Sequence, residues 1–232
     1  MLQEQFYPTP KEVAEKMVAP YAKDLRDRSI IDPSAGAGHL LDAVLDCRIK
    51  WLEEKVPDYY DYHDREAKSM KAQCHAIEID PDLQATLRGK GYELIGEDFL
   101  SFNTPFHFDL WLMNPPFKDG AKHLLKAWNM CKGGDIVCLL NAETIKNPHT
   151  KERQLLQAII EQHGTVEYLG QVFAQSERPT DVEIAMVRLT KDEGENLWDE
   201  VGGKKVSFDE MAEDFQHNQV TRESVIEQLL RV

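Results

Sequence analysis

A short apolar strand that leads through a loop of small residues into an amphipathic helix is the feature that most restricts the fold of this sequence. The strand is predicted at Ser29–Asp32, the loop at Pro33–Gly38 and the helix at His39–Glu54. Strand, tight turn and helix in succession are typical of an α/β fold, in which the helix packs on a sheet. The loop glycines also allow a ligand close to the backbone at the carboxyl end of the strand, where open parallel sheets bind ligands.

The alternation of strand and helix continues along the chain. Further strands are predicted at residues 74–79, 92–95, 108–113, 135–141, 165–172 and 182–189, and helices at 10–24, 81–88, 119–131 and 151–162. This alternation predicts a mainly parallel sheet with helices on both faces. Only a polar link joins the last two strands, so they are expected to form an antiparallel hairpin at one sheet edge. Thr9 and Pro10 are expected to be the N-cap and first position of the first helix.

Composition limits the classes of protein to which this chain can belong. Its 232 residues are 42% hydrophobic and 29% charged, which suits one large domain whose core needs no disulfide or metal. The cysteines form no C-x-x-C pair, which indicates a reducing compartment and argues against zinc; they are Cys47, Cys74, Cys131 and Cys138. No stretch approaches the length of a membrane span, so a cytoplasmic protein without a membrane partner is expected.

The net charge of −14 argues against a protein that holds nucleic acid by bulk electrostatics. It leaves room for an enzyme with a locally basic cleft. The cations to examine there are Lys118, Lys122, Lys126 and Arg178, for which ordinary surface positions are the alternative.

Carboxylates follow three successive strands. The second strand ends in Glu78-Ile79-Asp80 and the third in Gly96-Glu97-Asp98-Phe99, after Asp32 at the end of the first. Glu78 is well placed to accept hydrogen bonds from two ribose hydroxyls, whereas Asp80 is also expected to cap the helix that follows it. Leu41 stands where a dinucleotide fingerprint needs a third small residue, which disfavours nicotinamide cofactors. The three strand ends together predict a nucleoside pocket.

The fourth strand delivers Asn114-Pro115-Pro116-Phe117 to the same edge of the sheet. Successive prolines keep the backbone extended and donate no hydrogen bonds, so the carbonyls of Asn114 and Pro115 form a stiff set of acceptors. The asparagine amide oxygen adds an acceptor, and Phe117 adds a flat face. This group predicts a site for a planar amine, whose N–H bonds are accepted while its ring stacks on the phenylalanine.

In these motifs and their order, the chain resembles the class I S-adenosylmethionine-dependent amino-methyltransferases. It is most similar to adenine-N6 DNA methyltransferases of the gamma arrangement, including small phage and bacterial members. The resemblance extends from residue 6 to about residue 190 and rests on Phe6–Pro10, Asp32–Gly38, Glu78–Asp80, Gly96–Phe99 and Asn114–Phe117. It implies a Rossmann-like class I methyltransferase fold with a seven-stranded, mainly parallel sheet that ends in an antiparallel hairpin.

The resemblance also implies a role for each motif. The loop and Thr9 would surround the methionine part of the cofactor with Asp32 near its ammonium group, Glu78 would hold the ribose, and Asp98 would accept from its adenine. Phe117 would stack on the target base. The implied cofactor-binding residues are Tyr7, Thr9, Asp32, Pro33, Ser34, Ala35, Gly36, Gly38, Glu78, Ile79, Asp80, Asp98, Phe99 and Asn114. The implied catalytic residues are Asn114, Pro115, Pro116 and Phe117, and no metal is implied.

The expected reaction is transfer of a methyl group from S-adenosylmethionine to the N6 amine of adenine in DNA. Acceptors from Asn114 and Pro115 can draw the nitrogen toward tetrahedral geometry and stabilise the positive charge that develops on it. No nucleophilic cysteine is needed, and a duplex base must be flipped out of the stack. RNA adenine, a glutamine amide in a protein, and a cofactor-binding subunit active only in a complex stay open as alternatives.

The sequence predicts a catalytic domain at residues 1–190, with a long insertion at 55–73, and an acidic extension at 191–232 with a further helix at 221–230. The insertion is either a solvated helical excursion or a wall over the substrate cleft. No separate target-recognition domain is expected. Sequence specificity is therefore relaxed, or it depends on the insertion and the link at 175–180, or it comes from a partner subunit.

Overall fold

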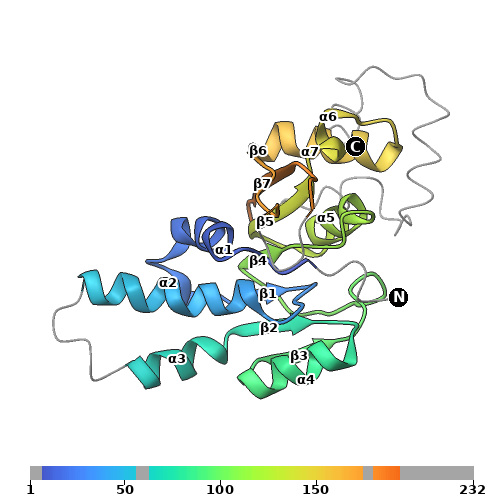
Figure 1. The fold of residues 1–232 in the computed structure, drawn as a ribbon. Coiled ribbons are helices and arrows are strands. Elements are labelled where there is room, and N and C mark those ends of the chain that lie inside the picture. The colour runs from blue at the N-terminus through green and yellow to red at the C-terminus, as the bar shows by residue number, and fades with distance from the viewer. Residues whose placement is uncertain (1–6, 56–62, 175–179, 194–232) are drawn as a thin grey trace.

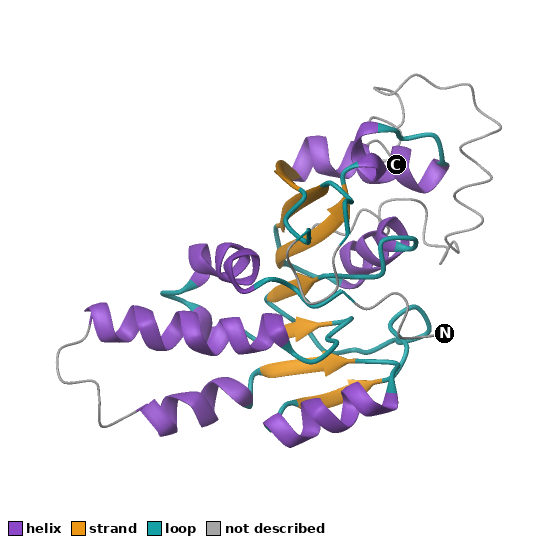
Figure 2. Ribbon diagram, in the orientation of Figure 1, coloured by secondary structure: helices purple, strands orange, loops and turns teal. Residues whose placement is uncertain are grey.

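The computed structural model describes residues 7–55, 63–174 and 180–193, and its centre is a single twisted sheet (Figures 1 and 2). The strand order is β3-β2-β1-β4-β5-β7-β6, with β7 antiparallel to both of its neighbours and the other pairs parallel. The strands are β1 (Ile30–Asp32), β2 (Cys74–Ile77), β3 (Glu93–Gly96), β4 (Leu110–Met113), β5 (Gly134–Asn141), β6 (Gly164–Gly170) and β7 (Ile184–Lys191). The predicted mainly parallel sheet with a terminal antiparallel hairpin is confirmed.

Helices cover both faces of this sheet. They are α1 (Lys11–Val18), α2 (His39–Lys55), α3 (His63–Lys71), α4 (Pro81–Lys90), α5 (Gly120–Met130), α6 (Glu143–Lys146) and α7 (Lys151–His163), with short 3-10 turns η2 (Ala19–Tyr21) and η3 (Leu25–Asp27). Side chains from α1, α2, α3 and α4 fill the core on one face, and those from α5 and α7 fill the core on the other.

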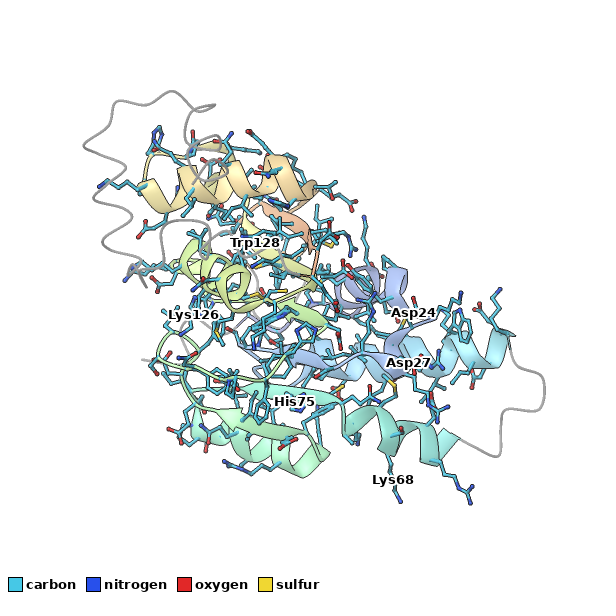
Figure 3. All side chains as sticks on the ribbon, turned by 180° about the vertical axis from the view of Figure 1, so that it is seen from behind. Asp24, Asp27, Lys68, His75, Lys126 and Trp128 are labelled. Atoms are coloured by element: carbon cyan, nitrogen blue, oxygen red, sulfur yellow. The ribbon has the colours of Figure 1, made fainter. Side chains whose placement is uncertain are left out.

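The strands supply both cores because successive side chains of a strand point to opposite faces. Ile30 packs in the core with α1 and α2, whereas Ile31 packs in the core with α5 and α7. On β4, Leu112 and Trp111 divide in the same way. Trp128 of α5, labelled in Figure 3, is buried and lies 4.8 Å from the His163 ring at the end of α7. Strands buried on both faces explain the uninterrupted apolar runs in the sequence.

The strand order reverses direction at β1, which pairs with β2 on one side and with β4 on the other. The chain passes from β1 through β2 to β3 on one side of β1 and then crosses back to β4 on the other side. The loops that follow β1 and β4 therefore diverge. Such a switch point is where an open α/β sheet binds a ligand, outside the carboxyl ends of the strands.

The first helix is shorter than predicted. The expected helix at 10–24 ends at Val18, and the chain continues as η2, which contains Pro20. A proline ring clashes with the preceding turn and lacks an N–H, so the α-helix ends before it. The predicted N-cap was also wrong, because Pro10 is the N-cap and the Thr9 side chain instead accepts a hydrogen bond from Asn114.

The described part of the 55–73 insertion is α3, which packs on α2 and η3. In Figure 1, α2 runs away from the carboxyl end of β1, and α3 leads back into β2 at the amino ends of the strands. Arg48 of α2 binds Glu66 of α3 through a buried ion pair of 3.0 Å. This favours the helical excursion over the wall for α3. Residues 56–62 and the predicted helix at 221–230 lie outside the described residues.

The start of β5 depends on a glycine. Gly134 has a φ of +120°, and a Cβ there would lie 2.5 Å from the Asp109 carbonyl oxygen. Gly134→Ala is expected to lower the free energy of unfolding by about 3 kcal/mol, because backbone strain and a clash with backbone add together. Gly89→Ala in α4 meets no atom within 4 Å. That change should raise stability by about 0.5–1 kcal/mol. Urea unfolding of both variants measures these changes in stability. Equal effects of the two substitutions would contradict the special requirement for glycine at position 134.

Candidate active site

A cavity of about 270 Å³ opens at the carboxyl edge of the sheet, where β1, β2, β3 and β4 end. It is lined by Tyr7, Thr9, Asp32, Pro33, Ser34, Ala35, His39, Leu40, Ile77, Glu78, Ile79, Asp80, Leu83, Glu97, Asp98, Phe99, Leu100, Asn114, Pro116 and His123. All five motifs singled out in the sequence contribute to this lining. Of the predicted site residues, Gly36, Gly38, Pro115 and Phe117 are not part of it.

The loop after β1 is shaped by hydrogen bonds to the next strand. Ala35 N–H donates to Ile77 O at 3.0 Å, and Gly36 N–H donates to the Glu78 carboxylate at 2.7 Å. Gly36 and Gly38 have φ values of +55° and +86°. A Cβ at Gly38 would also lie 2.9 Å from the side chain of Leu87. These two glycines therefore shape the loop rather than line the cavity.

Glu78 and Asp80, which follow β2, are oriented by backbone N–H groups. The Glu78 carboxylate accepts from Asp80 N–H at 2.8 Å as well as from Gly36. Asp80 accepts from Asp82 N–H and Leu83 N–H, so the predicted cap of α4 is confirmed. Each Glu78 oxygen carries a second lone pair, so the buried carboxylate can still accept from a ligand.

Two apolar side chains are exposed at the cavity rather than buried in a core. Ile79 is 49% exposed and Leu100 is 40% exposed. The carboxylate of Asp98 accepts a hydrogen bond from Leu100 N–H at 3.0 Å, which holds this acceptor beside them. Apolar faces beside a carboxylate suit a flat, partly polar ring.

His123 and Lys126 of α5 lie beside Phe99. The His123 ring is 5.8 Å from the Phe99 ring, and burial lowers the pKa of this imidazole. Lys126, labelled in Figure 3, donates to Leu100 O at 2.7 Å, and its ammonium lies 5.4 Å from the Phe99 ring centre. Lys126 thus supports the wall of the cavity. His123 was not among the predicted site residues, although it shares the amphipathic pattern of α5.

Asn114 joins the end of β4 to the segment before α1. Its Nδ2 donates to Tyr7 O at 2.9 Å and to Thr9 Oγ1 at 3.0 Å. The two segments are more than a hundred residues apart in sequence, so no local pattern could have predicted this contact. Because both contacts use the amide nitrogen, the amide oxygen points away from them.

Phe117 belongs to a cluster of three aromatic rings. It stacks on Tyr7 at 5.2 Å with an interplanar angle of 20° and meets Phe173 edge-on at 5.8 Å. One face of Phe117 is therefore covered by Tyr7. Phe173 is fully buried, although in the sequence it belongs to the polar link between the last two predicted strands. The signal that could have found it is the apolar run Val172-Phe173-Ala174, which continues the preceding predicted strand into the link.

The cavity is negatively charged. Its lining contains the carboxyl groups of Asp32, Glu78, Asp80, Glu97 and Asp98, and no lysine or arginine among the described residues. Asp32 is 1% exposed, and burial together with the nearby Glu78 raises its pKa to about 8. Such a site favours a cationic ligand and disfavours the pyrophosphate of a dinucleotide.

Several solved structures share this fold. They include a modification subunit of a putative type I restriction enzyme from Vibrio vulnificus YJ016, with a TM-score of 0.57 and 15% identity over 82% of this chain and 45% of that one. The M protein of the type I restriction enzyme EcoKI has a TM-score of 0.59 and 14% identity over 79% and 43%. A putative RNA methyltransferase from Pyrococcus horikoshii has a TM-score of 0.53 and 16% identity over 83% and 89%.

The chain has the Rossmann-like fold of class I methyltransferases. It spans less than half the length of the two type I restriction proteins. No family model matches the sequence, and neither does any curated protein.

The remaining predictions concern surface cations, residues outside the described part of the chain, membrane spans and metal sites. Lys118 and Lys122 are exposed, whereas Phe6, Arg178 and residues 194–232 lie outside the described residues. In the part of the chain that the structure describes, no helix is long and apolar enough to cross a membrane, and no three His, Cys, Asp or Glu side chains are grouped to hold a metal.

The buried Asp32 carboxyl is expected to make stability depend on pH. Its pKa is about 8 in the folded protein and 3.8 ordinarily, so the folded chain keeps a proton that the unfolded chain loses. Its contribution is therefore full below pH 4 and is lost as the pH rises toward 8. From pH 5 to 7, wild type should lose up to about 1.4 kcal/mol of unfolding free energy per pH unit relative to Asp32→Asn. Urea unfolding at several pH values measures this.

The matched control is Asp46→Asn, which removes an exposed carboxylate from α2. Its pH profile should run parallel to that of the wild type. A parallel profile for Asp32→Asn as well would contradict the expected role of Asp32.

Proposed function

We propose that this protein transfers a methyl group from S-adenosylmethionine to the exocyclic N6 amine of adenine in DNA. The observation that carries the proposal is the position of Asn114: its side chain lies in the wall of a carboxylate-lined cavity in a class I methyltransferase fold. A methyl donor in that cavity and an amine held at Asn114 would be adjacent. The motif order of the sequence supports the choice of DNA adenine, as does the fact that two of the similar structures are parts of type I restriction enzymes.

The residues of the cavity fit S-adenosylmethionine. This cofactor carries a sulfonium, an ammonium and a carboxylate group, so its net charge is positive, together with a ribose and an adenine but no phosphate. When bound, it supplies an electrophilic methyl group. Asp32 would face the ammonium, Glu78 would accept from the ribose hydroxyls, and Asp98 would accept from the adenine amine between Ile79 and Leu100. Each assignment matches a charge, acceptor or apolar face present in the lining.

The acceptor groups after β4 suit an amine nucleophile. The N6 lone pair of adenine is delocalised into the ring, so the nitrogen attacks well only when its N–H bonds are drawn out of the ring plane. The Asn114 amide oxygen and the Pro115 carbonyl would accept these bonds and stabilise the charge that develops. The methylated nitrogen then releases its extra proton. Phe117 would stack on the base through the ring face that Tyr7 leaves uncovered.

The cysteines do not favour the alternative chemistry of carbon-5 cytosine methylation, which needs a thiolate nucleophile. Burial raises the pKa of Cys74 to about 12 and holds the pKa of Cys138 well above its ordinary value. No cysteine is among the described residues that line the cavity.

RNA adenine is the second candidate substrate, because the putative RNA methyltransferase from Pyrococcus horikoshii shares the fold over 83% of this chain. We propose further that DNA sequence recognition is supplied by a partner subunit. The support for this is the −14 net charge, which opposes unaided binding to a polyanion, and the type I restriction context of two similar structures.

Nucleoside mass spectrometry tests the reaction directly. The protein and S-adenosylmethionine are incubated with unmethylated duplex DNA, single-stranded DNA and RNA, with Asn114→Ala as the inactive variant. Asn129→Ala is the matched control, since it removes an exposed amide from α5. N6-methyladenine in a DNA pool, lost only with Asn114→Ala, is expected. Product in RNA alone would change the substrate class, and no product in any pool with cofactor binding intact would refute activity of the chain alone.

Two substitutions should separate cofactor binding from transfer. Asp98→Ala removes the acceptor proposed for the cofactor adenine and should weaken S-adenosylmethionine binding by about tenfold to a hundredfold. Asn114→Ala should leave that affinity nearly unchanged and abolish transfer. Calorimetry and turnover measure the two effects, with Asp82→Ala on the exposed face of α4 as the control for Asp98. The opposite pattern would refute this division of roles.

A further inference from the structure

The segment before α1 orients the side chain that the proposed reaction depends on. Nδ2 of Asn114 donates to Tyr7 O at 2.9 Å and to Thr9 Oγ1 at 3.0 Å. An amide nitrogen carries two hydrogens, so these bonds use both. We propose that Thr9 is a positioning residue for methyl transfer, whose hydroxyl fixes the plane of the Asn114 amide and so aims its oxygen at the amine that receives the methyl group. This inference rests on the proposed function and concerns the same site.

The two acceptors have different parts in this arrangement. An asparagine amide can be turned by 180°, which exchanges its oxygen and nitrogen and would present N–H groups to an amine that also carries N–H groups. The Tyr7 carbonyl opposes that orientation, because a backbone oxygen can only accept and would face the amide oxygen. The Thr9 hydroxyl then binds the second hydrogen and sets the plane of the amide.

The same bonds should strengthen Asn114 as an acceptor. Hydrogen bonds donated by the nitrogen of an amide polarise the group and increase the negative charge on its oxygen, because bonded groups in a chain reinforce one another. Thr9 is only 7% exposed, so water cannot readily replace its hydroxyl. Loss of that hydroxyl would leave one N–H of Asn114 without its acceptor at the cavity wall.

This role differs from contact with the methionine part of the cofactor, which the resemblance implied for Thr9. Thr9 lines the cavity, so both roles are near at hand, and kinetics separate them. A group that binds cofactor changes the affinity for S-adenosylmethionine. A group that orients Asn114 changes turnover at saturating cofactor and leaves that affinity unchanged.

Three variants test the inference. Thr9→Val replaces the hydroxyl by a methyl group of similar size, Thr9→Ser keeps the hydroxyl, and Thr86→Val removes a hydroxyl from the exposed face of α4. Thr9→Val is expected to lower kcat about tenfold, the cost of leaving one partly buried amide hydrogen without its partner. The S-adenosylmethionine Kd should change less than about twofold. Thr9→Ser should restore turnover, and Thr86→Val should match the wild type.

Three results would overturn the inference. They are wild-type kcat in Thr9→Val, a weakened S-adenosylmethionine affinity with unchanged kcat, and equal losses in Thr9→Val and Thr9→Ser. The second result would indicate that Thr9 binds the cofactor, and the third would indicate that Thr9 acts through packing alone.

A spectroscopic readout keeps the inference separate from the proposed function. The two side-chain amide protons of Asn114 can be assigned in ¹⁵N–¹H spectra by their loss in Asn114→Ala. In Thr9→Val one of them should move upfield and exchange faster with water, whereas both should stay in place in Thr9→Ser. Unmoved protons in Thr9→Val would refute the inference. A wild type that methylates nothing would refute the proposed function and leave this measurement to decide the role of Thr9.

Discussion

The candidate site depends on the pairing of one three-residue strand. β1 is buried on both faces and pairs in parallel with β2 and with β4. In this register Asp32 lies opposite Ala76, and Ile31 lies opposite Trp111. Glu78 and Asn114 therefore leave the sheet just past the level of Asp32. A register slip of one residue would turn every side chain of a strand to the other face, so the two cores enforce the alignment.

The strand ends carry the charges, and backbone groups hold them in place. Glu78 accepts from the N–H groups of Gly36 and Asp80, so one carboxylate ties the loop after β1 to the start of α4. Asp32 lies deeper, and burial raises its pKa to about 8. A buried carboxyl that is reluctant to ionise gains most from a cationic ligand, because the ligand supplies the missing counter-charge. The acidity of the cavity is thus more informative about its ligand than the net charge of the chain.

The segment before α1 completes the site from a distance. The Tyr7 carbonyl accepts from Asn114, while the Tyr7 ring stacks on Phe117. One residue thereby contacts the first and the last member of the Asn114–Phe117 motif. Phe173, far along the chain, closes the aromatic cluster from another side. This side of the candidate site is consequently assembled from three segments, and only the one around Phe173 lies outside the motifs of the sequence.

The sequence by itself determined the alternation of strands and helices, the hairpin at the sheet edge, and the strand-end motifs that line the cavity. These are local properties, because hydrophobic period, glycine loops and proline pairs act over a few residues. Only the tertiary structure decided which partners the side chains take. Thr9 was predicted to cap a helix, but its side chain binds Asn114. Phe117 was predicted to offer a flat face to a ligand, and one of its faces is stacked on Tyr7. His123 and Phe173 belong to no sequence motif. Such contacts join segments far apart in the chain, and packing of the two cores selects them after the local elements have formed.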